Sequence, residues 1–479
     1  MTTRNVTFLG AGSGFTAGVL RDVMLIPGLA GGELRLVDID SKRLVITTKL
    51  IEQLAGHMKQ KHGVDWRVTG TTDRRKVLPG TDYIINCIEV SGTECVRHDN
   101  DIPLKYGIDQ CIGDTIGPGG IMKALRTVPA WLEILADVER LCPGALVLNY
   151  TNPMSIMTLA AVRSTRAQVV GLCHSVQGTS KKMARVANVP YEELAFRCGG
   201  INHLAWLTEL RHNGRDLYPK IFRRAREDRE TYESDPVRFD MMFHFGAFIT
   251  ESSGHLSEYL PYYRKRADLL KRYARDGYRG GSSFYADNWP KWRRDCDRKR
   301  DELAKDIARM DLNRGHEYAS DIIEAHALNR PKVIYGSVLN AGLIPNLPAD
   351  GVVEVATLVN NTGFNPTRFG ELPPQMAALC ASHMRVYDLV VRGLMTRDRE
   401  AIYHAMQLDP LSAAVCAPAE LRQMTDEMAL AERRFIPAWM TKGLKSGARR
   451  GGGRGTGKVV VGIGRMGRRT KDKGPFAAG

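Results

Sequence analysis

A cysteine and a histidine stand side by side in the segment GLCHSVQG, directly after the apolar run QVVG. A second histidine, His203, follows thirty residues after Cys173, in the segment GGINHLAW. A thiolate and an imidazole from separate segments can hold a divalent metal ion, and two protein ligands leave room for substrate and water. A packed cysteine and a hydrogen-bonded histidine are the alternative. Spacing alone leaves both open.

A second unusual segment is GDTIGPGGIMKALRTVP, which places Asp114, three glycines and Pro118 before a predicted helix. This pattern is typical of a turn followed by a helix with an acidic cap. It also fits a backbone concavity whose polar side chains line a cleft between cofactor and substrate. Asp114 is therefore a candidate catalytic residue.

A glycine turn near the N-terminus, FLGAGSGFTAG, separates a predicted strand from a predicted helix. Gly10 permits the tight turn, Gly12 lets a pyrophosphate approach the backbone at the helix N-terminus, and Ser13 belongs to the same turn. The third fingerprint position is Phe15 rather than glycine, so the match is incomplete. The next strand ends at Asp38, and an acid there favours NAD over NADP because it binds a ribose diol and repels a 2′-phosphate.

The elements that must position these residues are short apolar strands that alternate with helices through about residue 180. The strands are NVTFLG, ELRLVDID, DYIINCIEV, GALVLNY and QVVGLC. This alternation predicts an α/β fold with a parallel, doubly wound sheet. Ligands bind beyond the carboxyl ends of such strands, where IEVSG, NYTNPM and GLCHSVQG are expected to meet.

The pattern changes after residue 180. Asn213-Gly214 predicts a hairpin turn, residues 219–330 are mostly helical, and KVIYGSVLNAGLIPNLPADGVVEVATLV predicts an antiparallel pair. Residues 371–440 are again expected to be helical. The predicted division is an N-terminal Rossmann-type domain at 1–180, an α+β domain for substrate, metal and oligomerisation at 181–440, and a basic Gly-rich tail at 441–479.

Composition limits the classes of partner. The net charge of +15 suggests a polyanion, but eleven Lys and Arg residues and one Asp lie in 441–479, so the first 440 residues hold only +5. We therefore expect no nucleic-acid partner. Nine dispersed cysteines without a CxxC pair are typical of free thiols. No apolar run is long enough for a membrane span and no signal peptide is recognised, so a cytoplasmic protein is predicted.

Six motifs carry a resemblance to a known family. GAGS, DTIGPGG, NYTNPM, GLCHSVQGT, GINHLAW and TESSGHLSEYLPYYRK occur in this order. Together they resemble the NAD- and metal-dependent glycoside hydrolases of family 4, over about residues 4–440, and CHSVQGT is most similar to the α-galactosidase (melibiase) branch. The resemblance implies a Rossmann domain followed by an α+β domain, as in lactate and malate dehydrogenases, and a homodimer or homotetramer.

The resemblance also implies a mechanism with NAD and Mn²⁺ as cofactors and a small α-glycoside as substrate. The sugar is oxidised at C3, the C1 leaving group is eliminated across C1 and C2, water adds, and C3 is reduced again. Family 4 thus departs from the two-carboxylate scheme of most glycosidases. Thiolate and imidazole ligands would by softness alone suggest Zn²⁺.

Residue roles follow from the matched motifs. Cys173 and His203 match the metal ligands, and Asn152 matches a sugar-binding position. His174 stands where another branch has an acidic general acid, so it could protonate the leaving oxygen or hold a sugar hydroxyl.

The base that removes the C2 proton is expected in TESSGHLSEY, where Glu251 and Tyr259 are both candidates. Gly254 departs from the branch, which usually has Glu at this position, and this puts the identity of the sugar in doubt.

Three other functions stay open from the sequence. The same family also accommodates α-glucosidases and α-uronidases acting on galacturonides or glucuronides. A net NAD-dependent dehydrogenase would share the cofactor domain, although GLCHSVQGT does not fit its His–Asp relay. A non-enzymatic basic binding protein is motivated only by the tail.

Overall fold

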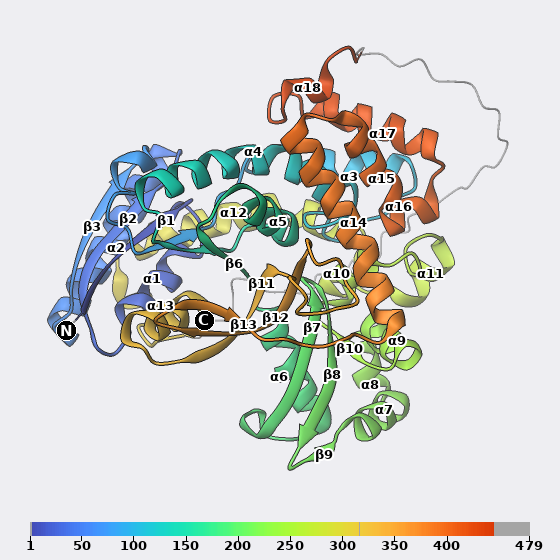
Figure 1. Ribbon diagram of the computed structural model, residues 1–479, viewed down its shortest axis with the longest axis horizontal. Coiled ribbons are helices and arrows are strands. Elements are labelled where there is room, and N and C mark those ends of the chain that lie inside the picture. Colours follow the sequence, from blue (N-terminus) through green and yellow to red (C-terminus); the bar gives the residue numbers. More distant parts are fainter. Residues whose placement is uncertain (1, 316, 445–479) are drawn as a thin grey trace.

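The computed structural model describes residues 2–315 and 317–444 (Figure 1). All but the first four residues of the predicted tail at 441–479 lie outside the described part of the chain.

Six parallel strands form one half of a single sheet. They are β1 (Thr2–Leu9), β2 (Leu29–Val37), β3 (Asp65–Thr71), β4 (Tyr83–Asn86), β5 (Leu146–Asn149) and β6 (Gln168–Leu172). Their order is β3-β2-β1-β4-β5-β6, and every neighbouring pair is parallel. This is the strand order of dinucleotide-binding sheets. In such sheets the chain adds strands first on one side of β1 and then, starting with β4, on the other side. The predicted Rossmann-type sheet is confirmed.

The central strands are apolar on both faces because helices cover both sides of a parallel sheet. Every residue of β4 and β5 is buried. The connecting helices are α1 (Thr16–Met24), α2 (Ser41–His62), α3 (Val96–Lys105), α4 (Gly117–Leu141), α5 (Met154–Ser164) and α6 (Ser175–Ala187). The helix expected at 120–141 is α4, which begins three residues earlier.

Antiparallel strands continue the same sheet beyond β6. They are β7 (Leu194–Ile201), β8 (Leu204–His212), β9 (Arg215–Asp216), β10 (Phe248–Ile249), β11 (Lys332–Leu339), β12 (Val352–Asn360) and β13 (Gly363–Pro366). The order runs β6-β11-β12-β7-β8-β10, with β13 beside β12 and β9 beside β8. The predicted antiparallel pair is β11–β12. Because β11 pairs with β6, one sheet joins the two predicted domains.

The predicted hairpin turn is present between β8 and β9. His212 pairs with Arg215, which leaves Asn213 and Gly214 as a two-residue turn. Their φ angles of 49° and 75° are those of the turn type that Asn-Gly favours. A second tight turn, between β7 and β8, contains Asn202 and His203 and was not predicted.

Helices fill the remainder of the C-terminal half. They are α7 (Tyr218–Glu227), α8 (Arg229–Glu233), α9 (Pro236–Phe245), α10 (Ser253–Tyr259), α11 (Ala267–Tyr273), α12 (Phe284–Leu303), α13 (Tyr318–Leu328), α14 (Pro374–Thr396), α15 (Arg399–Leu408), α16 (Pro410–Val415), α17 (Pro418–Ala431) and α18 (Ala438–Thr441). The helical segment predicted at 371–440 therefore corresponds to α14–α18, which gather beside α3 and α4 (Figure 1). Within the described ranges, no helix combines the length and apolar character needed to cross a bilayer.

Candidate active site

Cys173, His203 and Glu251 meet at one edge of the sheet. Cys173 follows the last residue of β6, His203 lies in the β7–β8 turn, and Glu251 follows β10. Cys173 Sγ is 3.3 Å from His203 Nε2, and Glu251 Oε2 is 3.4 Å from the same nitrogen. The three donor atoms lie within 4.8 Å of one another, which is close enough to share one cation.

The backbone holds two of these residues in a conformation that side chains rarely adopt. His203 has a φ of 64° and Glu251 a φ of 76°. Such left-handed backbone costs of order 1–3 kcal/mol and persists only where the surrounding structure fixes it. His203 follows β7 and Glu251 follows β10, and both strands pair with β8, so the sheet holds the two residues close together.

The ionisation of the three groups suits a metal site. Burial lowers the pKa of His203, so the imidazole is neutral and its nitrogen is available as a ligand. Burial and the Glu251 carboxylate raise the pKa of Cys173. Burial also opposes ionisation of Glu251, but the His203 and His255 imidazoles outweigh it and lower its pKa to about 2. A divalent cation would favour the thiolate of Cys173.

A row of alternating charges leads from this cluster to Asp114. His255 Nδ1 is 3.3 Å from Glu251 Oε1, and His255 Nε2 is 3.8 Å from Asp114 Oδ1. Burial disfavours the imidazolium of His255, but Glu251 and Asp114 hold its pKa well above the ordinary value. Lys123 Nζ then lies 3.4 Å from Asp114 and 3.1 Å from Glu89. Asp114 thus lines the site rather than capping a helix.

The residues present fit a divalent cation. Thiolate, imidazole and carboxylate are all metal ligands. Three carboxylates and two cations, His255 and Lys123, leave the charged row one negative charge in excess. Within the described chain, the buried Nδ1 of His203 has no hydrogen-bond partner, which leaves that nitrogen to carry the proton when Nε2 binds a metal.

A second group, Cys95, His98 and Glu432, has a similar spacing of donor atoms. It already contains a cation, because Arg126 donates to Glu432 Oε2 at 2.8 Å and also pairs with Asp99. The guanidinium would repel a metal ion at this distance. The first group is therefore the candidate metal site.

The glycine turn follows β1, at the point where the strand order of the parallel sheet reverses. Gly10 has a φ of 79°, and a Cβ there would come within 2.5 Å of the carbonyl oxygen of Cys87, at the end of β4. Asp38 accepts a hydrogen bond from the Gly12 amide at 2.6 Å. Ser13 is half-buried in the same turn. The turn and the acid thus form one unit, as a dinucleotide site requires.

His174 lies apart from the metal cluster although it follows Cys173 directly. Its side chain is 41% exposed, its Nε2 is 3.1 Å from Glu317 Oε2, and its ring stacks on Tyr318. Asn152 is half-buried after β5, next to a cis peptide bond with Pro153. Both residues are at the carboxyl edge, where a sugar could contact them.

Tyr259 is fully buried at the end of α10. Its ring centroid is 6.2 Å from that of His203 and 4.9 Å from that of His383. Burial raises its pKa well above the ordinary value, so the phenol stays protonated. Glu251 has the opposite character, since its low pKa makes it a weak base. Neither candidate has the near-neutral pKa of an ideal general base.

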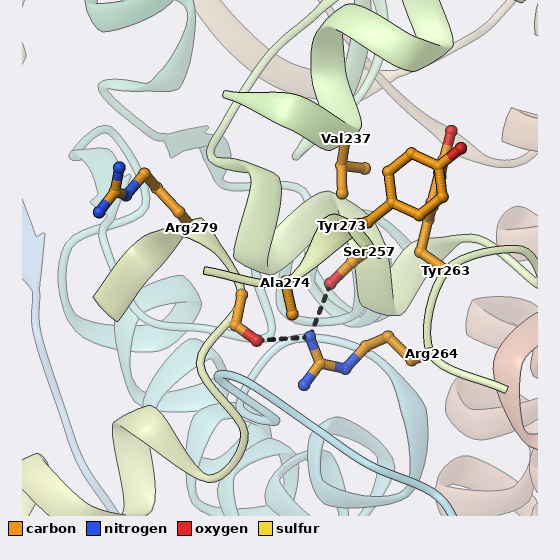
Figure 2. A pocket seen from close by; sticks show the side chains of 8 residues that line it. Val237, Ser257, Tyr263, Arg264, Tyr273, Ala274 and Arg279 are labelled. Atoms are coloured by element: carbon orange, nitrogen blue, oxygen red, sulfur yellow. Dashed lines mark hydrogen bonds between the residues drawn. The ribbon is translucent and has the colours of Figure 1, made fainter. Parts of the chain in front are cut away.

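The segment around α10 is fixed by buried hydrogen bonds and one buried ion pair. Glu258 accepts hydrogen bonds from the backbone amides of residues 111–113, directly before Asp114. Figure 2 shows a small pocket beside it, in which the Arg264 guanidinium donates to Ser257 Oγ at 3.1 Å and to the Gly280 carbonyl at 3.0 Å. Arg264 also pairs with Asp109. The guanidinium occupies this space, so the pocket is a packing junction.

Sequence reasoning missed several residues that the fold brings to the site. His255 and Lys123 were within the quoted motifs, and the available indication was an ionisable side chain inside each motif. Glu354, on β12, belongs to an apolar strand pattern, VVEVATLV, in which a single acid is exceptional. Burial and the neighbouring Cys173 raise the pKa of Glu354 to about 8.

Two family models match most of the chain. The family described as "Family 4 glycosyl hydrolase" matches residues 5–189. The family described as "Family 4 glycosyl hydrolase C-terminal domain" matches residues 198–412. The alpha-galactosidase of Bacillus subtilis (strain 168) is 38% identical over 442 residues, which cover 91% of this chain and 100% of that protein. The alpha-galactosidase of Rhizobium meliloti (strain 1021) is 36% identical, over 92% of this chain and 90% of that protein.

A solved structure shares the fold. A 6-phospho-alpha-glucosidase from gut microorganisms, in complex with NAD and Mn²⁺, aligns with a TM-score of 0.74 at 23% identity and covers 91% of this chain and 99% of that one. Sequence and fold agree over nearly the whole length of these relatives. The chain belongs to family 4 of the glycosyl hydrolases, as the six ordered motifs predicted.

Proposed function

We propose that the protein is an NAD- and Mn²⁺-dependent α-galactosidase. It would hydrolyse α-galactosides by oxidation at C3, elimination across C1 and C2, addition of water and re-reduction at C3. The observation that carries the proposal is the cluster of Cys173, His203 and Glu251 at the carboxyl edge of a dinucleotide-type sheet. The similarity to two α-galactosidases supports the choice of sugar.

When bound, NAD supplies a hydride acceptor and donor, and the cation stabilises negative charge on sugar oxygens. Cys173 and His203 would hold the cation, with Glu251 as a third ligand or as a charge that orients His203. Asp38, Gly10, Gly12 and Ser13 would hold the dinucleotide.

The remaining roles belong to residues around the charged row. His174 and Asn152, at the exposed edge, would bind sugar hydroxyls, and His174 would protonate the leaving oxygen. The Asp114 carboxylate lies beside the Lys123 and His255 cations, so it would keep both directed into the site. Either Glu251 or Tyr259 would take the C2 proton.

The assay that tests the function uses aryl α-glycosides. We expect hydrolysis of p-nitrophenyl α-galactoside that requires NAD⁺ and Mn²⁺, stops with EDTA and returns when the metal is added back. In D₂O the product should carry deuterium at C2, because the elimination removes that proton. Hydrolysis that is indifferent to both EDTA and NAD⁺ removal would contradict the proposal.

The same assay separates the other candidates. Preference for an α-glucoside, α-galacturonide or α-glucuronide would change the substrate and keep the mechanism. Formation of one NADH per sugar would instead indicate a net dehydrogenase.

The two candidate bases are separated by Tyr259→Phe and Glu251→Gln. Loss of the base should lower kcat by about 10²–10⁴-fold and abolish solvent exchange at C2, while Mn²⁺ affinity stays unchanged. Loss of a metal ligand should weaken Mn²⁺ binding in calorimetry. We expect Glu251→Gln to show the second behaviour and Tyr259→Phe the first. If Glu251→Gln instead lowers kcat and abolishes exchange at C2 with unchanged Mn²⁺ affinity, Glu251 is the base.

A further inference from the structure

Glu354 is a buried acid behind the metal cluster. It lies in the middle of β12 and is 0% exposed. In the sheet it pairs with Gly200 of β7, two residues before Asn202 in the β7–β8 turn. Within the described residues, neither of its carboxylate oxygens has a partner at normal hydrogen-bond geometry. A buried carboxyl without such partners costs several kcal/mol, so its presence calls for a reason.

The two predicted metal ligands are among the groups that act on Glu354 electrostatically. Its carboxyl interacts electrostatically with Cys173 and His203, and the Asn202 amide lies beside both this carboxyl and Cys173. The His203 ring turns its Nε2 toward Cys173 Sγ, at 3.3 Å. Its Nδ1 is therefore on the opposite edge of the ring, buried and without a hydrogen-bond partner among the described residues. His203 Nδ1 is thus an unsatisfied donor position and the Glu354 carboxyl is an unsatisfied acceptor. The two groups interact electrostatically.

We propose that Glu354 is a positioning residue of the metal site: when a cation is bound, its carboxylate accepts the Nδ1 hydrogen of His203 while the Asn202 amide donates to the Cys173 thiolate. This inference rests on the proposed function, because it needs a cation at Cys173 and His203. A metal-bound histidine usually donates its other ring N–H to a carboxylate or carbonyl, which fixes the tautomer and makes the ligand more basic. Loss of such a partner typically weakens metal binding 10–100-fold.

The register of the sheet explains how the acid reaches this place. Glu354 is opposite Ser337 on β11, and β11 in turn pairs with β6 at Leu172, one residue before Cys173. On its other side β12 pairs with β7, which leads into His203. β12 thus lies between β11, whose other neighbour β6 leads to Cys173, and β7, which leads to His203. A side chain in the middle of this strand can contact both.

Two variants test the proposal with purified full-length protein and metal alone. Glu354→Leu removes the acceptor at similar volume, and Glu354→Gln keeps an acceptor oxygen without the charge. We expect Mn²⁺ affinity, measured by calorimetry, to fall 10–100-fold in Glu354→Leu and less in Glu354→Gln. In the Co²⁺ form, the exchangeable, hyperfine-shifted N–H resonance of His203 should be lost in Glu354→Leu and retained in Glu354→Gln.

Stability in the absence of metal separates positioning from a structural role. Replacing a buried carboxyl that lacks hydrogen-bond partners by a packed apolar side chain is often neutral or stabilising, so the Tm of metal-free Glu354→Leu should equal or exceed that of the wild type. The matched control is Asp409→Ala, at another fully buried acid, which caps α16 through Ser412, so that alanine removes the cap. This control should lower Tm and leave Mn²⁺ affinity unchanged.

Each outcome has a definite meaning. Mn²⁺ binding by Glu354→Leu within threefold of the wild type would overturn the inference and leave the proposed function standing. Retention of the shifted resonance in Glu354→Leu would do the same. A wild-type protein that binds no Mn²⁺ would overturn the proposed function and this inference together. If Glu354→Leu does not fold, equal affinity in Glu354→Gln and the wild type is the result that rejects the proposal.

Discussion

Two aspartates at the end of β2 show how position separates similar residues. Asp38 accepts hydrogen bonds from the Gly12 amide at 2.6 Å and the Asp40 amide at 2.8 Å, so it belongs to the glycine turn. Asp40 accepts from Lys42 and Arg43 amides and caps α2. Asp38 is therefore the one of the two that we predict to bind a ribose.

Asp38→Asn tests this difference. The neutral amide would bind a ribose diol less well and would no longer repel a 2′-phosphate, so NAD affinity should fall about tenfold and the preference over NADP should shrink. Calorimetric titration with each dinucleotide measures both effects. Asp40→Asn is the control, because asparagine caps helices as well as aspartate does and binding should not change. An unaltered NAD to NADP ratio in Asp38→Asn would remove Asp38 from the cofactor site.

At the scale of elements, α10 connects the metal cluster to the Asp114 segment. Its second residue, Gly254, faces a crowded junction, where a Cβ would lie 2.6 Å from the Tyr278 carbonyl oxygen and 2.7 Å from Cys111 Sγ. Gly254, which departs from the α-galactosidase pattern, therefore allows the segments that contain Tyr278 and Cys111 to pack closely against α10. A larger residue at this position would require those segments to move.

Gly254→Ala should therefore destabilise the protein. The added methyl group meets backbone that cannot easily shift, and overpacking of this kind costs about 1–3 kcal/mol. Gly56→Ala is the matched control in α2, since nothing lies within 4 Å of its added Cβ. Alanine is the better helix former, so the control should gain about 0.5–1 kcal/mol. Urea unfolding followed by circular dichroism measures both changes. A change of the same sign and size at the two sites would exclude the steric account.

At the scale of the whole molecule, α14 is joined to α10 through a buried histidine. His383 is 0% exposed, and its Nε2–H donates to the Tyr259 carbonyl at 2.7 Å. Burial lowers the pKa of His383 to about 4. The folded protein therefore keeps this imidazole neutral at a pH where the unfolded chain binds a proton.

This difference makes stability depend on pH. Between pH 6.5 and 4 the unfolded state binds more protons at this position, so the free energy of unfolding falls as the pH falls, by about 3 kcal/mol over the whole window. His383→Gln should show a correspondingly weaker decline in urea unfolding at pH 7, 5.5 and 4.5. His244→Gln, at a side chain that is 71% exposed, should keep the wild-type decline. Parallel declines in His383→Gln and the wild type would disprove the assignment.

Much of the fold was determined by local sequence. Gly10, Gly12 and Asp38 predicted a strand, turn and helix at the N-terminus, because turn chemistry and strand periodicity act over a few residues. The Asn213-Gly214 turn and the β11–β12 pair followed from the same kind of pattern. The family was recognised from six short motifs. The predicted domain boundary, cytoplasmic location and oligomeric state stay predictions.

Only the tertiary structure decided which polar residues share the site. Cys173 and His203 were paired by resemblance, but the approach of Glu251, His255 and Glu354 to that pair depends on the order β6-β11-β12-β7-β8-β10, which no local pattern encodes. His174 was adjacent to Cys173 in sequence and yet faces Glu317 instead. Local sequence determines periodicity and turns, whereas the order of strands is set by burial of the whole sheet, so the contacts between distant segments appear only in the folded chain.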